Sequence, residues 1–388
     1  MTVLTPRERV NQALSHHNPD RMPVDFLATP EVWKELIDHL GDALPDVEPS
    51  DYFDTRWEAL LQFLDVDCRT VSYDQFVSAP EDKLQGRVDW WNALSRSTPN
   101  RMWRQVTKDG IWRTVWGHNL QVFEHEQGAY EEVTAPPLHA PADLDDLKKH
   151  SWPDPSWWDF STLPDALSQL DRSTEYHIRF RIGSVFELAW QLRGMEQFFQ
   201  DMVLEPEIPA YIMERITEVH VENTRRVMEL ASDRIDMVYL YDDMAAQNNL
   251  LMSKAMWADQ IRPLHERIFS VAREYDKPIM YHSDGAVASL IPEWLEMGVK
   301  VLNPIQADAP GMDPQFLKDT YGDRLSFHGG IDIIKTLPLG TEKDVRDEIS
   351  ERRRVLGDQG GYIMASSHHI QAGTPIENVL AMYDLSLR

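Results

Sequence analysis

The sequence predicts an α/β fold, a single (β/α)8 (TIM) barrel that spans residues 1–388 and carries an N-terminal elaboration. Six stretches in the later part of the chain are apolar and β-branched, then break into polar, acidic or histidine residues before a helical pattern begins: 177–187, 237–243, 278–285, 299–306, 325–332 and 362–371. Such alternation of strands with helices favours a parallel sheet. At 388 residues, one barrel with insertions accommodates the whole chain.

The elements before this alternation are less regular. Thr5-Pro6-Arg7-Glu8 is typical of a helix start, and residues 22–26 and 66–73 are predicted to be short strands. Residues of about 74–135 are predicted to form an insertion over the barrel mouth, an antiparallel flap rich in tryptophan: Trp90, Trp91, Trp103, Trp112 and Trp116. Aromatic walls suit planar ligands, although most tryptophans are expected in the core or an interface. Residues of about 136–164, broken by prolines, form a connector.

Helices are predicted between the later strands. The segment 207–230 places Ile208, Ile212, Ile216 and Val219 on one face, the pattern of a helix that covers a sheet. Further helices are predicted near 253–275, 286–297, 314–321, 342–357 and 375–385. The strands and helices together account for the second half of the chain as a barrel.

The charge and cysteine content limit the classes of partner. The chain has 64 acidic and 38 basic residues, a net charge of −26, which repels nucleic acid and anionic membranes. Cys68 is the only cysteine, so a disulfide framework and a zinc site built on several thiolates are both excluded. We expect a cytoplasmic protein without a membrane span that binds a small molecule, and a homodimer is compatible with these features.

The candidate site residues lie at the predicted strand ends, because a parallel barrel carries its catalytic groups there. His282 and Asp284 are two residues apart and point to the same side of an extended chain. His368 ends the last strand, and a barrel brings both strand ends to one mouth. Two histidines and a carboxylate form a ligand set for zinc, iron or manganese. The alternative is that Asp284 caps the next helix or belongs to an Asp-Gly turn.

Three carboxylates near this set are candidate catalytic residues. Asp242 and Asp243 are adjacent, so they repel each other and one pKa is expected to rise. In the alternative, Asp243 caps a helix while Asp242 pairs with an arginine. Glu187 is a candidate fourth metal ligand or a group that holds a ligand in place. His328 is expected either to contact the substrate or to satisfy a backbone group.

Several motifs in the same order resemble the uroporphyrinogen decarboxylase superfamily over nearly the whole chain: Thr5–Val10, Pro19–Val24, His282–Gly285, Leu302–Gln306, His328–Asp332 and Thr374–Val379. The resemblance implies a (β/α)8 barrel, independently of the periodicity. It also implies one of two activities, porphyrinogen decarboxylation or methyl transfer with corrinoid proteins. His328, Asn303 and Gln306, which lie in these motifs, are predicted to bind substrate.

The departures from the family pattern favour the methyltransferases. The decarboxylases carry an arginine-rich segment after the first strand, whereas Leu27–Trp33 contains no arginine to bind a polycarboxylate. The similar methyltransferases hold zinc with a His-x-Cys pair and a second Cys. His282 matches their histidine, while Asp284 and His368 stand at or next to the cysteine positions. Such a His/carboxylate site favours an oxygen-bearing substrate over a thiol.

The predicted function is therefore a metal-dependent methyltransferase, with zinc or another divalent metal at His282, Asp284 and His368. It demethylates a small, methoxylated substrate and passes the methyl group to a corrinoid on a separate protein. Asp242 or Asp243 orients the substrate or manages a proton. The alternatives are a metal-dependent decarboxylase or lyase of a small organic acid, a folate-dependent methyltransferase, and a non-catalytic binding barrel.

Overall fold

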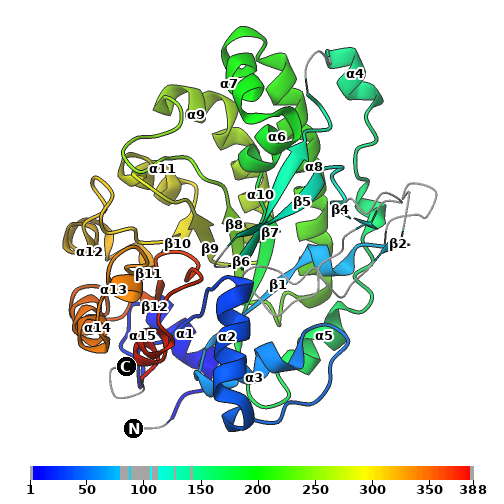
Figure 1. Cartoon of the computed structure of the whole chain (residues 1–388). Coiled ribbons are helices and arrows are strands. Elements are labelled where there is room, and N and C mark those ends of the chain that lie inside the picture. Colours follow the sequence, from blue (N-terminus) through cyan, green and yellow to red (C-terminus); the bar gives the residue numbers. More distant parts are fainter. Residues whose placement is uncertain are drawn as a thin grey trace.

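The computed structural model describes residues 3–78, 87–88, 105–106, 112–125, 128–139 and 143–384. Its centre is a curled, parallel seven-stranded sheet in the order β1-β7-β8-β9-β10-β11-β12, surrounded by helices (Figure 1). The strands are β1 (Cys68–Ser72), β7 (His177–Gly183), β8 (Met237–Tyr241), β9 (Ile279–His282), β10 (Val299–Asn303), β11 (Ser326–Ile331) and β12 (Tyr362–Ser366). The α/β barrel fold is confirmed, and each of the six predicted later stretches contains one strand.

A short extended segment joins the two edges of this sheet. Val24 forms a parallel bridge with Met364 of β12, and the Asp25 N–H donates to the Met364 carbonyl at 2.9 Å. On its other side, the Val24 carbonyl accepts from the Asp67 N–H, just before β1, at 3.0 Å. The predicted strand at 22–26 therefore appears as a single bridged residue that lies between the edge strands.

One helix closes the N-terminal end of the barrel. Thr5 caps α1 (Pro6–Leu14) with a capping box to Glu8. Leu14 of this helix packs against the interior residues Met237, Met280 and Val301. The lower layer of the barrel interior is therefore apolar, and the polar residues of the same strands begin above it.

The remaining helices cover the outside of the sheet (Figure 1). They are α2 (Pro30–Leu40), α3 (Thr55–Phe63), α5 (Leu163–Leu170), α6 (Phe186–Arg193), α7 (Met195–Leu204), α8 (Glu207–Ala231), α9 (Lys254–Gln260), α10 (Arg262–Glu274), α11 (Ile291–Glu296), α12 (Pro314–Tyr321), α13 (Thr336–Leu339), α14 (Glu342–Leu356) and α15 (Ile376–Met382). The single helix predicted at 253–275 is two helices, because Pro263 lacks a backbone N–H and starts α10 in its first turn.

The segment between β1 and β7 adds a second, antiparallel sheet in the order β2-β3-β4-β5-β6: Arg87–Val88, Gln105–Val106, Trp112–Arg113, Asn119–His125 and Gly128–Ala135. Trp116 is buried in the main core. Trp90, Trp91, Trp103 and the side chain of Trp112 lie outside the described residues. The short helix α4 (Leu144–Lys149) follows this sheet.

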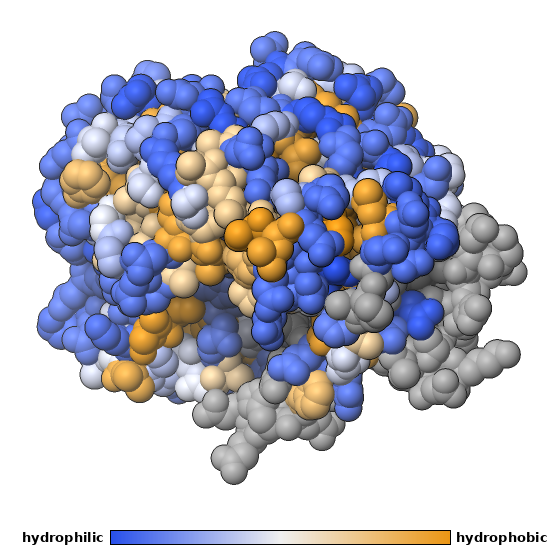
Figure 2. Space-filling view, turned by 90° about the horizontal axis from the view of Figure 1, so that it is seen from above, coloured by the Kyte–Doolittle hydropathy of each residue, from blue (hydrophilic) through white to orange (hydrophobic). Residues whose placement is uncertain are grey.

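The surface seen from above is mainly hydrophilic, with hydrophobic residues gathered towards the middle of that face (Figure 2). Where the chain is described, its helices are all too short or too polar to cross a bilayer.

Candidate metal centre at the barrel mouth

The structure brings His282, Asp284 and His368 together at the C-terminal ends of β9 and β12. The Asp284 Oδ2 atom lies 3.8 Å from His282 Nε2 and 3.4 Å from His368 Nε2. One donor atom from each residue falls within 4.8 Å of the others. A tetrahedral ion with bonds of ~2.1 Å separates its ligands by about 3.4 Å. The two Asp284 distances therefore fit a divalent metal ion after a contraction of at most about 0.4 Å, and the two histidine donors, within 4.8 Å of each other, after one of at most about 1.4 Å.

The loops after β8 and β9 hold Asp284 in place. The Asp284 N–H donates to Asp243 Oδ1 at 2.8 Å, and the Met244 N–H donates to Ser283 Oγ at 2.8 Å. Gly285 follows with a positive φ of 82°, and a Cβ there would clash with the Ala246 carbonyl oxygen. The close approach of the two loops therefore needs glycine after Asp284.

His368 and Asp284 open onto a cavity of about 460 Å³. Gln306 lines it too, and its Oε1 atom accepts the Gly285 N–H at 2.9 Å. Among the described residues, Arg352 is the only arginine or lysine in the wall. A cavity of this size holds a small molecule next to the candidate ligands.

Two further carboxyl groups lie beside the ligands. Asp243 Oδ1 is 3.8 Å from His282 Nε2, near enough to serve as a fourth ligand after a small shift. Glu187 is partly buried, and burial together with the Asp243 and Asp242 charges raises its pKa well above its ordinary value. A raised pKa favours the protonated form of this carboxyl group, which is able to donate a proton. Glu187 is not among the clustered ligand atoms of the described residues.

Asp242 contacts the first turn of α6. Its carboxylate is fully buried and accepts the N–H groups of Val185, Phe186 and Glu187 at 2.9, 2.8 and 2.8 Å. His265 Nε2 lies 2.9 Å from the same group. The Asp242 oxygens are thus occupied by donors within the protein, and its predicted role toward a substrate stays a prediction. Asp242 binds the first turn of α6, where the helix dipole favours a negative charge, and so positions Glu187.

His328 and Asn303 are both buried below the mouth, and neither lines the described cavity. Asn303 Oδ1 lies 2.5 Å from His282 Nδ1, and Asn303 Nδ2 lies 2.6 Å from His328 Nδ1. The described contacts of Asn303 are therefore with the candidate ligand His282 and with His328, and the substrate-binding role of Asn303 and His328 stays a prediction.

Asp25 and Arg179 complete this buried group and were not predicted from the sequence. Asp25 Oδ2 lies 2.8 Å from His328 Nε2 and 2.5 Å from Arg179 Nη2. Burial alone would raise the pKa of Asp25, but the Arg179 charge and the His328 hydrogen bond hold it below its ordinary value. The available signal was buried charge in a predicted strand: one aspartate in Met22–Phe26 and two arginines in His177–Gly183.

The fold and the site define a (β/α)8-barrel protein with a candidate metal centre at the C-terminal ends of its strands. The model of the family described as uroporphyrinogen decarboxylase (URO-D) matches residues 122–386. Since the match covers more than half of the chain, the protein belongs to this family. No curated protein matches the chain.

Two solved structures are similar to the chain. A methyltransferase from Methanosarcina mazei is 16% identical, with a TM-score of 0.61 over 98% of this chain and 97% of that chain. The endo-1,4-beta-xylanase XylE from Penicillium canescens is 14% identical, with a TM-score of 0.35 over 60% of this chain and 80% of that chain. The first similarity supports the fold over its full length, and the second carries no argument.

Proposed function

We propose that this chain is a metal-dependent methyltransferase that demethylates a small, methoxylated substrate and passes the methyl group to a corrinoid on a separate protein. The observation that carries the proposal is the convergence of His282, Asp284 and His368, whose donor atoms lie within 4.8 Å of one another, with Asp284 and His368 lining a cavity at the barrel mouth. Family membership and the full-length similarity to a methyltransferase from Methanosarcina mazei support it. A divalent metal bound there supplies a Lewis acid for the ether oxygen.

Other residues of the chain donate the proton, bind the substrate and position the candidate metal ligands. Glu187, whose pKa is raised by burial and by the Asp243 and Asp242 charges, donates a proton to the oxygen that loses the methyl group. Gln306, fixed by the Gly285 N–H, presents its amide to the substrate from the cavity wall. Asp243 holds the Asp284 backbone and lies beside His282. The cavity volume of about 460 Å³ favours a substrate of one ring.

A metal-dependent decarboxylase or lyase of a small organic acid is the second candidate. Arg352 in the cavity wall favours it, because a guanidinium group binds a carboxylate. This guanidinium already donates to Glu348 at 3.0 Å and to the Gly330 carbonyl at 2.9 Å. Since much of its hydrogen-bonding capacity is used within the protein, we place the methyltransferase first.

The test combines metal analysis with product analysis. Purified protein is assayed for bound metal and then incubated with methoxylated aromatic compounds and free cob(I)alamin, while methylcobalamin, the demethylated product and CO2 are measured. We expect about one metal ion per chain and methylcobalamin without CO2. His282→Ala abolishes both metal and product, whereas the control His39→Ala, a change of an exposed histidine in α2, leaves both unchanged. Protein without stoichiometric metal, together with an active His282→Ala variant, contradicts the proposal, and CO2 as product favours the second candidate.

A further inference from the structure

The barrel interior contains an unusual amount of buried charge directly below the candidate metal centre. Arg179 of β7, Asp25 and His328 of β11 have exposed fractions of 3%, 2% and 0%. Arg179 pairs in register with Met237, and its Nη1 atom lies 3.9 Å from Met280 Sδ, so this charge lies directly against the apolar cluster of Met237, Met280 and Val301. Replacing a buried ion pair by apolar side chains is often neutral or stabilising. Stability of the barrel therefore does not by itself explain why this layer is charged.

A continuous series of hydrogen bonds joins this layer to a metal ligand. In order from the mouth, the contacts are His282 Nδ1 to Asn303 Oδ1 at 2.5 Å, Asn303 Nδ2 to His328 Nδ1 at 2.6 Å, His328 Nε2 to Asp25 Oδ2 at 2.8 Å, and Arg179 Nη2 to Asp25 Oδ2 at 2.5 Å. The series runs across five parts of the barrel: β9, β10, β11, the bridged segment at Val24, and β7. The other Asp25 oxygen, Oδ1, accepts the Phe26 N–H at 2.9 Å, so each side-chain polar atom of Asn303, His328 and Asp25 has a partner.

The series also fixes the direction of each hydrogen bond. Asp25, ionised beside Arg179, only accepts, so His328 carries its proton on Nε2 and leaves Nδ1 as an acceptor. Asn303 therefore donates its NH2 group to His328 and turns its Oδ1 atom to His282. This oxygen accepts only from a protonated Nδ1. The lone pair of His282 is consequently on Nε2, the atom that lies 3.8 Å from Asp284 Oδ2.

We propose that Asn303, His328, Asp25 and Arg179 form a relay of positioning residues that holds His282 in the tautomer and orientation that bind metal through Nε2. The inference rests on the metal centre of the proposed function, which it deepens. Arg179 is anchored further by its Nε donor, which binds Thr70 Oγ1 at 3.0 Å. Outer partners of this kind change metal affinity about 10- to 100-fold when they are removed.

A relay makes a different prediction from a single hydrogen bond to His282. If only Asn303 mattered, a change at His328 would leave the metal site intact, since His328 does not contact His282. In a relay, removal of His328 frees the Asn303 amide to rotate and so releases the His282 tautomer. The decisive variants are therefore Asn303→Leu, which removes the first link at similar volume, and His328→Phe, which removes the second and leaves Asn303 in place.

The experiment measures Co²⁺ binding and the visible d–d spectrum of the Co²⁺-loaded full chain. The wild type, Asn303→Leu, His328→Phe and the control Tyr362→Phe are compared, with thermal unfolding of each apo form as a check of folding. Tyr362 of β12 donates a buried hydrogen bond to the carbonyl of Gly329, which follows His328 in β11. Tyr362→Phe removes this bond and leaves the relay intact. We expect Co²⁺ affinity to fall about 10- to 100-fold in both relay variants, with an altered spectrum, and to stay within threefold in the control.

The results of these measurements support or overturn the relay, and they distinguish its failure from failure of the proposed function. Wild-type affinity and spectrum in His328→Phe would overturn the relay, while metal binding by the wild type and its loss in His282→Ala would still support the proposed function. A wild type that binds no Co²⁺ would overturn both. If His328→Phe does not fold, His328→Gln replaces it, because glutamine still reaches towards Asp25 but places no acceptor at the Nδ1 position, and the same loss of affinity is expected.

Discussion

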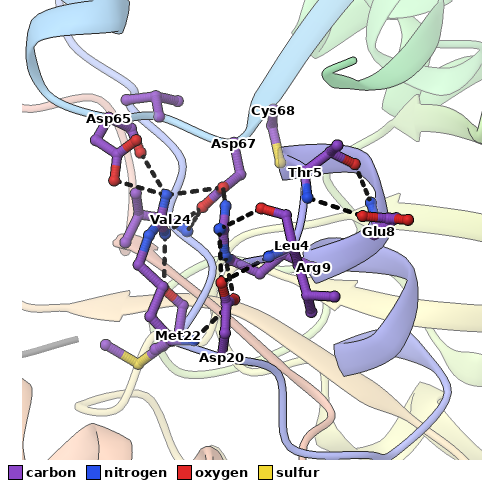
Figure 3. A network of polar contacts seen from close by, with 12 residues as sticks. Leu4, Thr5, Glu8, Arg9, Asp20, Met22, Val24, Asp65, Asp67 and Cys68 are labelled. Atoms are coloured by element: carbon purple, nitrogen blue, oxygen red, sulfur yellow. Dashed lines mark hydrogen bonds and ion pairs between the residues drawn. The ribbon is translucent and has the colours of Figure 1, made fainter. Parts of the chain in front are cut away.

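The acidic residues at the two ends of the barrel have opposite surroundings: they are paired with arginines at the N-terminal end and face other carboxylates at the mouth. At the N-terminal end, Asp67 is fully buried and accepts from Arg9 at 2.6 Å, from Arg21 at 2.7 Å and from the Val24 N–H at 2.8 Å. Asp20 binds Arg9 in the same network (Figure 3). At the C-terminal mouth, Glu187 and Asp243 face other carboxylates. In the described part of the chain, neither has an ion pair with an arginine or lysine.

This difference separates stability from function. Removal of one partner from a paired buried acid lowers the stability of the fold, whereas a group of unpaired acids and histidines is itself destabilising and is kept where a ligand completes the charge. The N-terminal network is therefore expected to respond to mutation through unfolding, and the mouth through metal binding and catalysis. Each prediction below tests whether that division is correct.

The largest effect is expected for Asp284→Ala at the mouth. Three protein ligands that share a metal-binding free energy of ~16 kcal/mol supply on the order of 5 kcal/mol each. Metal affinity should fall by more than a thousandfold, and methyl transfer with it. The free energy of unfolding measured in chelator should not fall, because among the described residues Asp284 has no partner of opposite charge other than the two histidines. A lower unfolding midpoint in chelator would place Asp284 among the stabilising residues instead.

Asp67→Ala should have the next largest effect, on stability alone. Removal of one partner from a buried ion pair costs about 4 kcal/mol, because Arg9 and Arg21 lose their shared carboxylate. Urea unfolding at pH 7 measures this cost. The activity per folded molecule should stay at the wild-type value, and the exposed control Asp42→Ala should change neither quantity. Loss of activity in folded Asp67→Ala protein would contradict the assignment of the N-terminal charges to stability alone.

Glu187→Gln should lower the rate about 100-fold, or ~2.7 kcal/mol, by removing a proton donor. Burial and the Asp243 and Asp242 charges raise the pKa of Glu187 and so favour its protonated form, which the neutral amide resembles in shape and charge. Metal affinity and the urea midpoint should both stay at wild-type values. The exposed control Glu196→Gln in α7 should have no effect on rate. An unchanged rate in Glu187→Gln would leave this carboxyl without a catalytic role.

Sequence reasoning located the strands because each one ends in a change from apolar to polar residues, as in Met280 to Asp284. It brought His282, Asp284 and His368 together because parallel strands end at one face. It did not predict the contact of Asp242, which caps α6 from another strand, because no spacing in the chain shows that contact. The Asn303 to His328 contact depends on the pairing of β10 with β11, and a single sequence does not fix that register.

The smallest effect is expected for Asp20→Asn, and it depends on pH. Burial alone would raise the pKa of Asp20, but the Arg9 hydrogen bond and the Leu4 N–H lower it to about 2. Because the folded pKa lies below the unfolded one, the stabilisation is complete above about pH 4 and is lost as the pH falls towards 2. With screening by solvent, the variant should be less stable by about 1 kcal/mol at pH 7. Urea unfolding at pH 7, 5 and 3 should show the gap between wild type and variant closing at the lowest pH. A gap of equal size at all three values would mean that Asp20 stabilises the N-terminal end by its shape and hydrogen bonds rather than by its charge.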